Sequence, residues 1–105
     1  NKVLRSKQSF KDGLDNNVWT FYYSNGKIQT KGSFENNLRI GKWEYYYESG
    51  SLKQISFYDK GKKSKKWIKY NENGDSLWVR TFRNDVLIKN RNIFLDSLQE
   101  NILIQ

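Results

Sequence analysis

Aromatic and β-branched residues recur along the chain in short runs, separated by polar segments rich in Asn, Asp and Gly. Near the middle, the runs Trp43–Tyr47 and Leu52–Tyr58 flank the polar stretch Glu48–Ser51. Runs of about six such residues, bounded by turn residues, predict strands joined as hairpins. A parallel crossover needs about a dozen residues, and no connection is that long, so we expect neighbouring strands to be antiparallel.

The pattern repeats with a period of 24 residues. Three series keep this step through three copies: Trp19, Trp43 and Trp67; Tyr22, Tyr46 and Tyr70; and Gly26, Gly50 and Gly74. A fourth series extends half a unit towards the N-terminus and consists of Phe10, Phe34, Tyr58 and Phe82. Such periodicity predicts a quasi-one-dimensional stack in which each unit contacts mainly its neighbours.

The predicted fold is therefore all-β, an elongated antiparallel meander of β-hairpin repeats. A half repeat covers residues 1–13, and full units cover residues 14–37, 38–61 and 62–85. The expected strands lie near residues 2–10, 18–23, 28–34, 42–47, 52–58, 66–70 and 77–83.

The turns within units carry Asn25-Gly26 and Asn73-Gly74. Asn-Gly is typical of type I′ hairpin turns, in which both central residues have positive φ, so we predict that turn type. A looser turn is expected between units. Its common register is occupied by residues that tolerate left-handed φ, namely Gly13, Asn37, Gly61 and Asp85.

Residues 86–105 depart from the pattern and predict a C-terminal cap, since Arg91 replaces the expected Trp and Leu98 the expected Gly. On a helix, Phe94, Leu98 and Ile102 would share one stripe. A degenerate hairpin is the alternative. Either element would close the open end of the sheet.

Composition excludes several kinds of chemistry. The chain has no Cys and no His, which removes disulfides, zinc sites, thiol nucleophiles and imidazole catalysis. Its mean hydropathy of −0.92 leaves no apolar run of about 20 residues for a membrane span. The carboxylates Glu44, Glu48, Glu72 and Asp75 show no recurring pair. We therefore expect a non-enzymatic protein without a cofactor or metal.

The net charge of +8 is concentrated in residues 60–91. The basic residues there are Lys60, Lys62, Lys63, Lys65, Lys66, Lys69, Arg80, Arg83, Lys89 and Arg91, opposed by Glu72, Asp75 and Asp85. Two interpretations stay open: solvated loop lysines, or a patch for an acidic partner. Nucleic acid is the least favoured partner, because no nucleic-acid motif is present and Lys outnumbers the Arg that base readout prefers.

The Trp series also has two interpretations, a sheet core or a partly exposed recognition strip. A single-layer sheet cannot cover both of its faces, so aromatic surface is expected to stay accessible. Tyr22, Tyr46 and Tyr70 alternate with the Trp residues and are the candidates, because a phenol supplies both contact area and a hydrogen bond.

The residues Trp19–Gly26, Gly41–Gly50 and Trp67–Gly74 resemble the bacterial MORN-repeat variant family, whose pattern is roughly G-x-W-x-x-Y-Y-x-N-G-x-L. The third copy departs from it at Lys65, Asn71 and Ser76. The resemblance covers roughly residues 2–85 and implies hairpin repeats. It also implies binding roles, which in bacterial proteins include antitoxin or immunity-type activity and in eukaryotic ones protein or phospholipid scaffolding.

The sequence thus predicts a protein-binding module that occludes a toxin or effector. The expected contact residues are Tyr22, Tyr46, Tyr70, Lys60, Lys62, Lys63, Lys65, Lys66, Arg80 and Arg83. The alternative is an envelope or surface scaffold that contacts anionic lipid or assembles with other repeats. Because the chain opens at Asn1, we expect a trimmed piece of a longer protein, located in the bacterial cytoplasm or, after signal removal, in the envelope.

Overall fold

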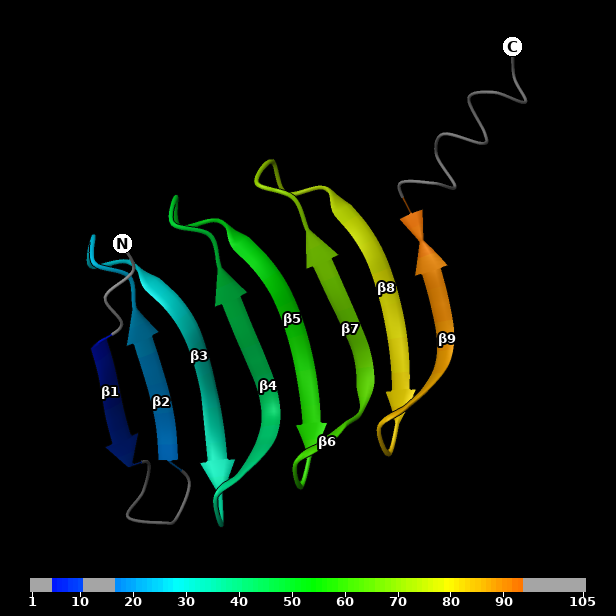
Figure 1. Ribbon diagram of the computed structural model, residues 1–105, viewed down its shortest axis with the longest axis horizontal. Coiled ribbons are helices and arrows are strands. Elements are labelled where there is room, and N and C mark those ends of the chain that lie inside the picture. The colour runs from blue at the N-terminus through cyan, green and yellow to red at the C-terminus, as the bar shows by residue number, and fades with distance from the viewer. Residues whose placement is uncertain (1–4, 11–16, 94–105) are drawn as a thin grey trace.

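The computed structural model describes residues 5–10 and 17–93, and all strands in that part belong to one antiparallel sheet (Figure 1). They are β1 (Arg5–Phe10), β2 (Asn17–Tyr22), β3 (Ile28–Glu35), β4 (Leu38–Tyr46), β5 (Leu52–Asp59), β6 (Lys62–Lys63), β7 (Lys65–Tyr70), β8 (Ser76–Arg83) and β9 (Val86–Asn92). The order across the sheet is β1-β2-β3-β4-β5-β7-β8-β9, and the short β6 pairs with β5. The predicted all-β meander of hairpins is confirmed.

The predicted turn type within the units is wrong. The Tyr23 N–H donates to Lys27 O (2.8 Å) and the Gly26 N–H donates to Tyr23 O (3.0 Å), which leaves three residues in the loop. Of these three, only Gly26 has positive φ, at +87°. This is a type I turn followed by a left-handed glycine. The Asn25 side chain fixes it by accepting from the Lys27 N–H at 2.9 Å, so Asn acts through its side chain rather than through a left-handed backbone.

The tight two-residue turns lie instead between the units. Positive φ at both residues is found at Asn36 (50°) and Asn37 (66°), and again at Lys60 (48°) and Gly61 (84°). The left-handed register predicted there is confirmed at Asn37, Gly61 and Asp85 (69°), but the turns are not loose. Because they are so short, β4 starts before the predicted residue 42 and β6 precedes β7. Gly13 and residues 2–4 lie outside the described part.

An aromatic ladder forms the core on one side of the sheet, here called the ladder face. Its rings, in order across the strands, are Trp19, Phe34, Trp43, Tyr58, Trp67 and Phe82. Successive centroids are separated by 5.0 Å (Phe34–Trp43) to 6.4 Å (Trp19–Phe34). The contacts are edge-to-face or tilted, a geometry that aromatic rings prefer. Trp43 and Trp67 are 2% and 8% exposed, so the Trp series supplies the core.

Small residues lie beneath the ladder tryptophans. A Cβ built on Gly32 would overlap the ring carbons Cδ2, Cε2 and Cε3 of Trp43. Ser56, one period later, is completely buried. The indole of Trp67 also donates from Nε1 to Phe57 O at 3.1 Å. A small, buried residue therefore occupies this position in two successive units.

Hydrogen bonds outside the strand ladders also connect neighbouring turn regions at both ends of the strands. At one end, the Gly61 N–H donates to Arg39 O (2.8 Å), and the Asp85 N–H donates to Lys63 O (3.0 Å). At the other end, Lys27 Nζ donates to Ser49 O at 2.9 Å. The separation between neighbouring hairpins is therefore fixed by bonds outside the strand ladders as well as within them.

The last strand is out of register with the repeat. Strand β5 pairs with β7, and Ile55 lies opposite Ile68. If the repeat continued, the pair 24 residues later would be Val79 and Asn92. The structure pairs Val79 with Arg91 instead. A shift of one residue turns every side chain to the other face. Arg91, although it stands at the Trp position, therefore lies on the face opposite the ladder.

The slip has a local backbone cause. In β4 and β7 the irregular pairing coincides with left-handed residues, Gly41 (φ 66°) and Lys65 (φ 60°). The corresponding Lys89 is not among the positive-φ residues of the described part. The shift in β8–β9 pairing falls between Thr81 and Phe82 and displaces β9 by a single residue. Arg91 thus keeps the Trp position of the repeat in the sequence, but its side chain does not lie on the ladder face.

The cap predicted for residues 86–105 begins as a strand, β9, which agrees with the hairpin alternative for that portion. The residues on which the helical alternative depended, Phe94, Leu98 and Ile102, lie outside the described part.

Candidate interaction surface

The second side of the sheet, here called the opposite face, carries the predicted tyrosines. Tyr22, Tyr46 and Tyr70 end strands β2, β4 and β7, and all three are half-buried. One strand lies between each pair of them, and strands are about 4.8 Å apart, so the rings form a row with a spacing of about 10 Å rather than a cluster.

Burial raises the pKa of several phenols above the ordinary value of 10.0. It raises the pKa of Tyr46, and the nearby Glu44 carboxylate raises that pKa further. Burial likewise raises the pKa of Tyr45 to about 12, with a further contribution from Tyr58. Burial also raises the pKa of Tyr23, and the Glu48 carboxylate raises that pKa further. At neutral pH these hydroxyls are hydrogen-bond donors, which suits polar recognition or bonds within the sheet.

Two of the phenols connect neighbouring units. The Tyr23 hydroxyl donates to Tyr46 O at 2.6 Å, and the Tyr47 hydroxyl donates to Tyr70 O at 2.7 Å. The same bond therefore recurs one period later, and it fixes the strands that carry the candidate tyrosines.

We expect Tyr47→Phe to lower the free energy of unfolding by about 1 kcal/mol, because one part-buried hydrogen bond is lost and Tyr70 O is left without it. The matched control is Tyr22→Phe, since the Tyr22 hydroxyl makes no bond within the described residues. Urea unfolding measures both variants. Equal losses would contradict the role given to the Tyr47 hydroxyl.

The five lysines expected to act as one loop patch are separated by the fold. Lys63 Nζ lies 5.0 Å from the Trp67 ring centroid and 5.2 Å from that of Phe82, on the ladder face. Lys65 Nζ lies 5.7 Å from the Phe57 ring. Their side chains cover aromatic rings and are less available to a partner. Lys60 and Lys62 are exposed around the turn between β5 and β7.

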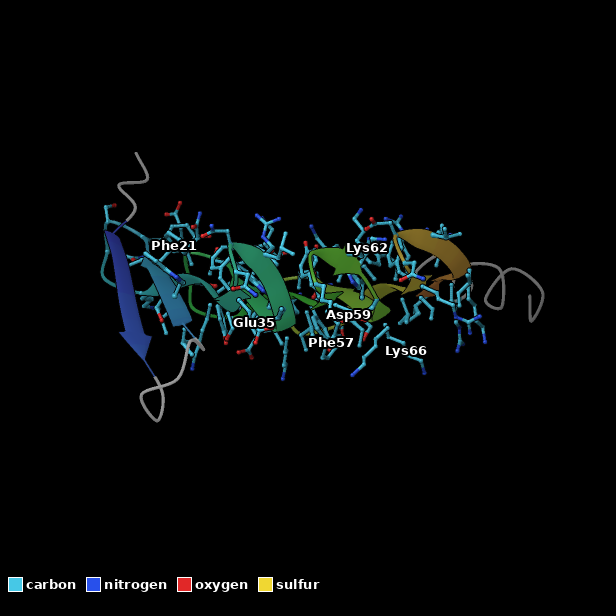
Figure 2. The ribbon with its side chains drawn as sticks, turned by 90° about the horizontal axis from the view of Figure 1, so that it is seen from below. Phe21, Glu35, Phe57, Asp59, Lys62 and Lys66 are labelled. Carbon is cyan, nitrogen blue, oxygen red and sulfur yellow. The ribbon has the colours of Figure 1, made fainter. Side chains whose placement is uncertain are left out.

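Lys66 and the two predicted arginines also divide between the faces. Figure 2 shows Lys66 on the same side of the sheet as Phe57. The Arg80 guanidinium lies 4.0 Å from the Trp78 ring centroid, and its Nε donates to Asn90 Oδ1 at 3.2 Å, on the ladder face. Arg83 follows Phe82 at the end of β8, so it is exposed on the opposite face with Lys66.

A shallow hollow of about 180 Å³ on the opposite face is lined by residues of three strands, and two of these strands, β7 and β9, supply cations. It is lined by Lys66, Val79, Thr81, Lys89 and Arg91. Lys66 and Lys89 both pair with Thr81, from its two sides. Among the described residues, the lining includes three cations and no carboxylate, which makes this part of the surface positive. Sequence reasoning counted Lys89 and Arg91 in the charge but missed this grouping, which depends on the slip of β9.

Among the described residues, no three His, Cys, Asp or Glu side chains are grouped so as to hold a metal ion. The same part of the chain contains no helix that is long and apolar enough to cross a membrane.

The hairpins, the period and the ladder can now be compared with known families. Residues 15–36 and 39–60 match the MORN repeat variant. MORN repeats are generally protein- or lipid-binding modules. The third hairpin lies outside both MORN matches, although its loop makes the same bonds, Asn71 N–H to Asp75 O (2.9 Å) and Gly74 N–H to Asn71 O (3.0 Å). No curated protein and no solved structure matches the chain.

Proposed function

We propose that this chain is a non-enzymatic, protein-binding MORN-repeat module that occludes an acidic partner, of the toxin or effector kind. The observation that carries the proposal is the combination of a preformed single-layer sheet with a cation-lined hollow on its opposite face. Hydrogen bonds between units hold that face in place before binding. Association therefore costs little conformational entropy in this chain.

The electrostatic part of the proposal concerns accessible cations only. Lys60, Lys62, Lys66 and Arg83 are exposed, and none of them has a ring contact among the described residues. They would accelerate encounter with an acidic surface, and an added-salt series would reduce that acceleration. Lys63 and Lys65 are left out, because replacing them would alter packing on Trp67 and Phe57 as well as charge.

The test uses, as the partner, the purified product of the gene that lies next to the gene for this chain. We expect wild-type protein to bind it, and the variant with Lys60, Lys62, Lys66 and Arg83 changed to Ser to bind about tenfold more weakly, mainly through slower association. The control changes Lys31 and Lys42 to Ser, which removes charge from β3 and β4 instead. Calorimetry gives the affinities, and stopped-flow mixing gives the rates.

Growth of cells that produce the adjacent gene's product gives a second measurement. Co-production of the chain should restore growth if that product is a toxin that the chain occludes, and the fourfold Ser variant should restore it less. Unchanged affinity and unchanged salt dependence in that variant would contradict the electrostatic part of the proposal.

A second candidate function is a scaffold that contacts anionic lipid. The cation-lined hollow also favours this role, since each basic residue near an anionic surface contributes about 1 kcal/mol. Flotation with phosphatidylcholine vesicles, with and without phosphatidylserine, separates the two candidates. Flotation only with the anionic lipid, together with failure to bind the adjacent gene's product, would favour the scaffold.

A further inference from the structure

The two Asn-Gly dipeptides of the chain occupy the same position in two different loops. Asn25-Gly26 lies between β2 and β3, and Asn73-Gly74 lies between β7 and β8, along the same margin of the sheet (Figure 1). An asparagine side chain can react with the backbone nitrogen of a following glycine, because glycine has no Cβ to hinder the close approach of the two groups. Each dipeptide is therefore a candidate for spontaneous modification.

The backbone is held in the same way in both loops. The Gly26 N–H donates to Tyr23 O at 3.0 Å. The Gly74 N–H donates to Asn71 O at the same distance of 3.0 Å. The two glycines have similar positive φ, 87° and 91°, and a Cβ built on either would meet no atom within 4 Å apart from its chain neighbours. Backbone restraint and crowding at the glycine therefore do not distinguish the two sites.

The Asn25 side chain is held at both of its polar atoms. Its Oδ1 accepts from the Lys27 N–H at 2.9 Å. Its Nδ2 donates to Glu48 O, in the next unit, at 3.0 Å. Rotation of the amide towards the Gly26 nitrogen would break both bonds, so the fold protects this dipeptide.

At Asn73 the corresponding backbone donor is already used. The Asp75 N–H, which stands where the Lys27 N–H stands in the first loop, donates to Asn71 Oδ1 at 3.0 Å. The same oxygen also accepts from the Asn73 N–H at 2.9 Å. The Asn73 side chain is exposed, and within the described residues it makes no hydrogen bond. Its amide can therefore rotate towards the Gly74 nitrogen without losing a bond.

The cause is a departure of the third unit from the repeat. The position of Asn71 is occupied by Tyr23 and Tyr47 in the first two units, and each tyrosine donates its hydroxyl to the following unit. Asn71 instead turns its side chain back into its own loop. The residue change that removes the tyrosine thereby also frees the Asn73 amide.

We propose that Asn73 is a site of spontaneous deamidation in the folded protein, whereas Asn25 is protected. The Gly74 nitrogen attacks Cγ of Asn73, an N–Cγ bond forms, the Cγ–Nδ2 bond breaks, and ammonia leaves with the proton of the Gly74 N–H. Water then opens the cyclic imide. Cleavage of the new N–Cγ bond gives aspartate, and cleavage of the original peptide bond gives isoaspartate. Water is the co-reactant and no partner is needed, so the inference is independent of the proposed function.

The products change the charge and the length of the loop. Either product adds a carboxylate beside Glu72 and Asp75, and the net charge of +8 falls by one. Isoaspartate also adds one carbon to the backbone, which displaces the Gly74 N–H from its bond to Asn71 O. Modified molecules are therefore separable from unmodified ones by ion exchange.

The test ages the purified full chain in mildly alkaline buffer and follows both dipeptides by peptide mapping with mass spectrometry. Labelling with an isoaspartyl methyltransferase counts isoaspartate separately. We expect Asn73 to be lost at least about tenfold faster than Asn25, because two side-chain hydrogen bonds must first break at Asn25. In concentrated urea the two rates should become similar, since the difference comes from the fold.

Two variants test the cause. Asn71→Tyr restores the residue of the other units and returns the Asp75 N–H to the Asn73 side chain, so deamidation should slow at least about threefold. Glu72→Ser is the matched control, because it gives the adjacent position the residue of the first loop and leaves that donor unchanged. It should alter the rate less than about twofold. Circular dichroism confirms that both variants remain folded.

Equal rates at Asn25 and Asn73 in the folded chain, or faster loss of Asn25, would overturn the proposal. Loss of Asn73 in urea but not in the folded chain would overturn it as well. A folded Asn71→Tyr variant that reacts as fast as wild type would show that the Asp75 N–H does not control the reaction. If that variant does not fold, the comparison of the two dipeptides in wild-type protein still decides.

Discussion

Replacing Gly32 by Ala is expected to destabilise the protein by about 3 kcal/mol, although it adds a single methyl group. The added Cβ would overlap three ring carbons of Trp43, which is 2% exposed and cannot move aside. Phe34 and Tyr58 flank the same indole with centroids at 5.0 Å and 6.2 Å. Relief therefore requires β3 to shift or the ladder to open.

Urea unfolding followed by Trp fluorescence measures this loss. The control is Ser33→Ala, one residue along the same strand, which is expected to change stability by less than about 0.5 kcal/mol. A loss at Gly32 as small as that of the control would show that the ladder tolerates an extra methyl and that its packing is loose.

The second large effect is expected at Trp43 itself. Trp43→Ala removes an inner ring of the ladder and should cost about 4 kcal/mol, because the cavity between Phe34 and Tyr58 cannot collapse in a rigid sheet. The total stability of a small domain is about 5–15 kcal/mol. The variant should therefore melt at a much lower temperature, as measured by calorimetry.

Two further variants separate the effect of the missing ring at Trp43 from the effects of its place in the ladder and of its indole N–H. Trp78→Ala removes a half-buried indole outside the ladder and should cost less than half as much. Trp43→Phe keeps a ring and removes an indole Nε1–H that is buried without a partner within the described part, so its loss should also be small. Equal losses for Trp43→Ala and Trp78→Ala would contradict the inner position of Trp43.

The architecture was predictable because one repeat period carries both the strands and the core. The spacing of Trp19, Trp43 and Trp67 places the indoles on every second strand, and Phe34 and Tyr58 fill the strands between them. The turn types were not predictable from the Asn-Gly pairs. The same dipeptide fits a type I′ turn or the end of a three-residue loop, and hydrogen bonding decides between them.

The candidate surface was predictable in composition but not in arrangement. The excess of lysine near residue 60 is plain in the sequence, yet ring contacts occupy Lys63 and Lys65. The grouping of Lys66, Lys89 and Arg91 depends on pairing that shifts by one residue in β9. The repeat period alone would place Arg91 on the ladder face with the Trp residues. Its position on the opposite face follows from the backbone at Lys89, which is not among the positive-φ residues of the described part.

The recurrence of the tyrosine bond has a consequence for how such a chain changes length. Tyr23 donates to Tyr46 O, and Tyr47 donates to Tyr70 O, so each junction uses interchangeable atoms. Excising residues 24–47 would join Tyr23 to Glu48, and Tyr23 would then stand where Tyr47 stood, beside the carbonyl of Tyr70. The sheet is thus modular, since whole hairpin units can be removed or added while the same tyrosine bond forms at each junction. The distance between the two ends of the sheet can therefore change without any change to the units between them.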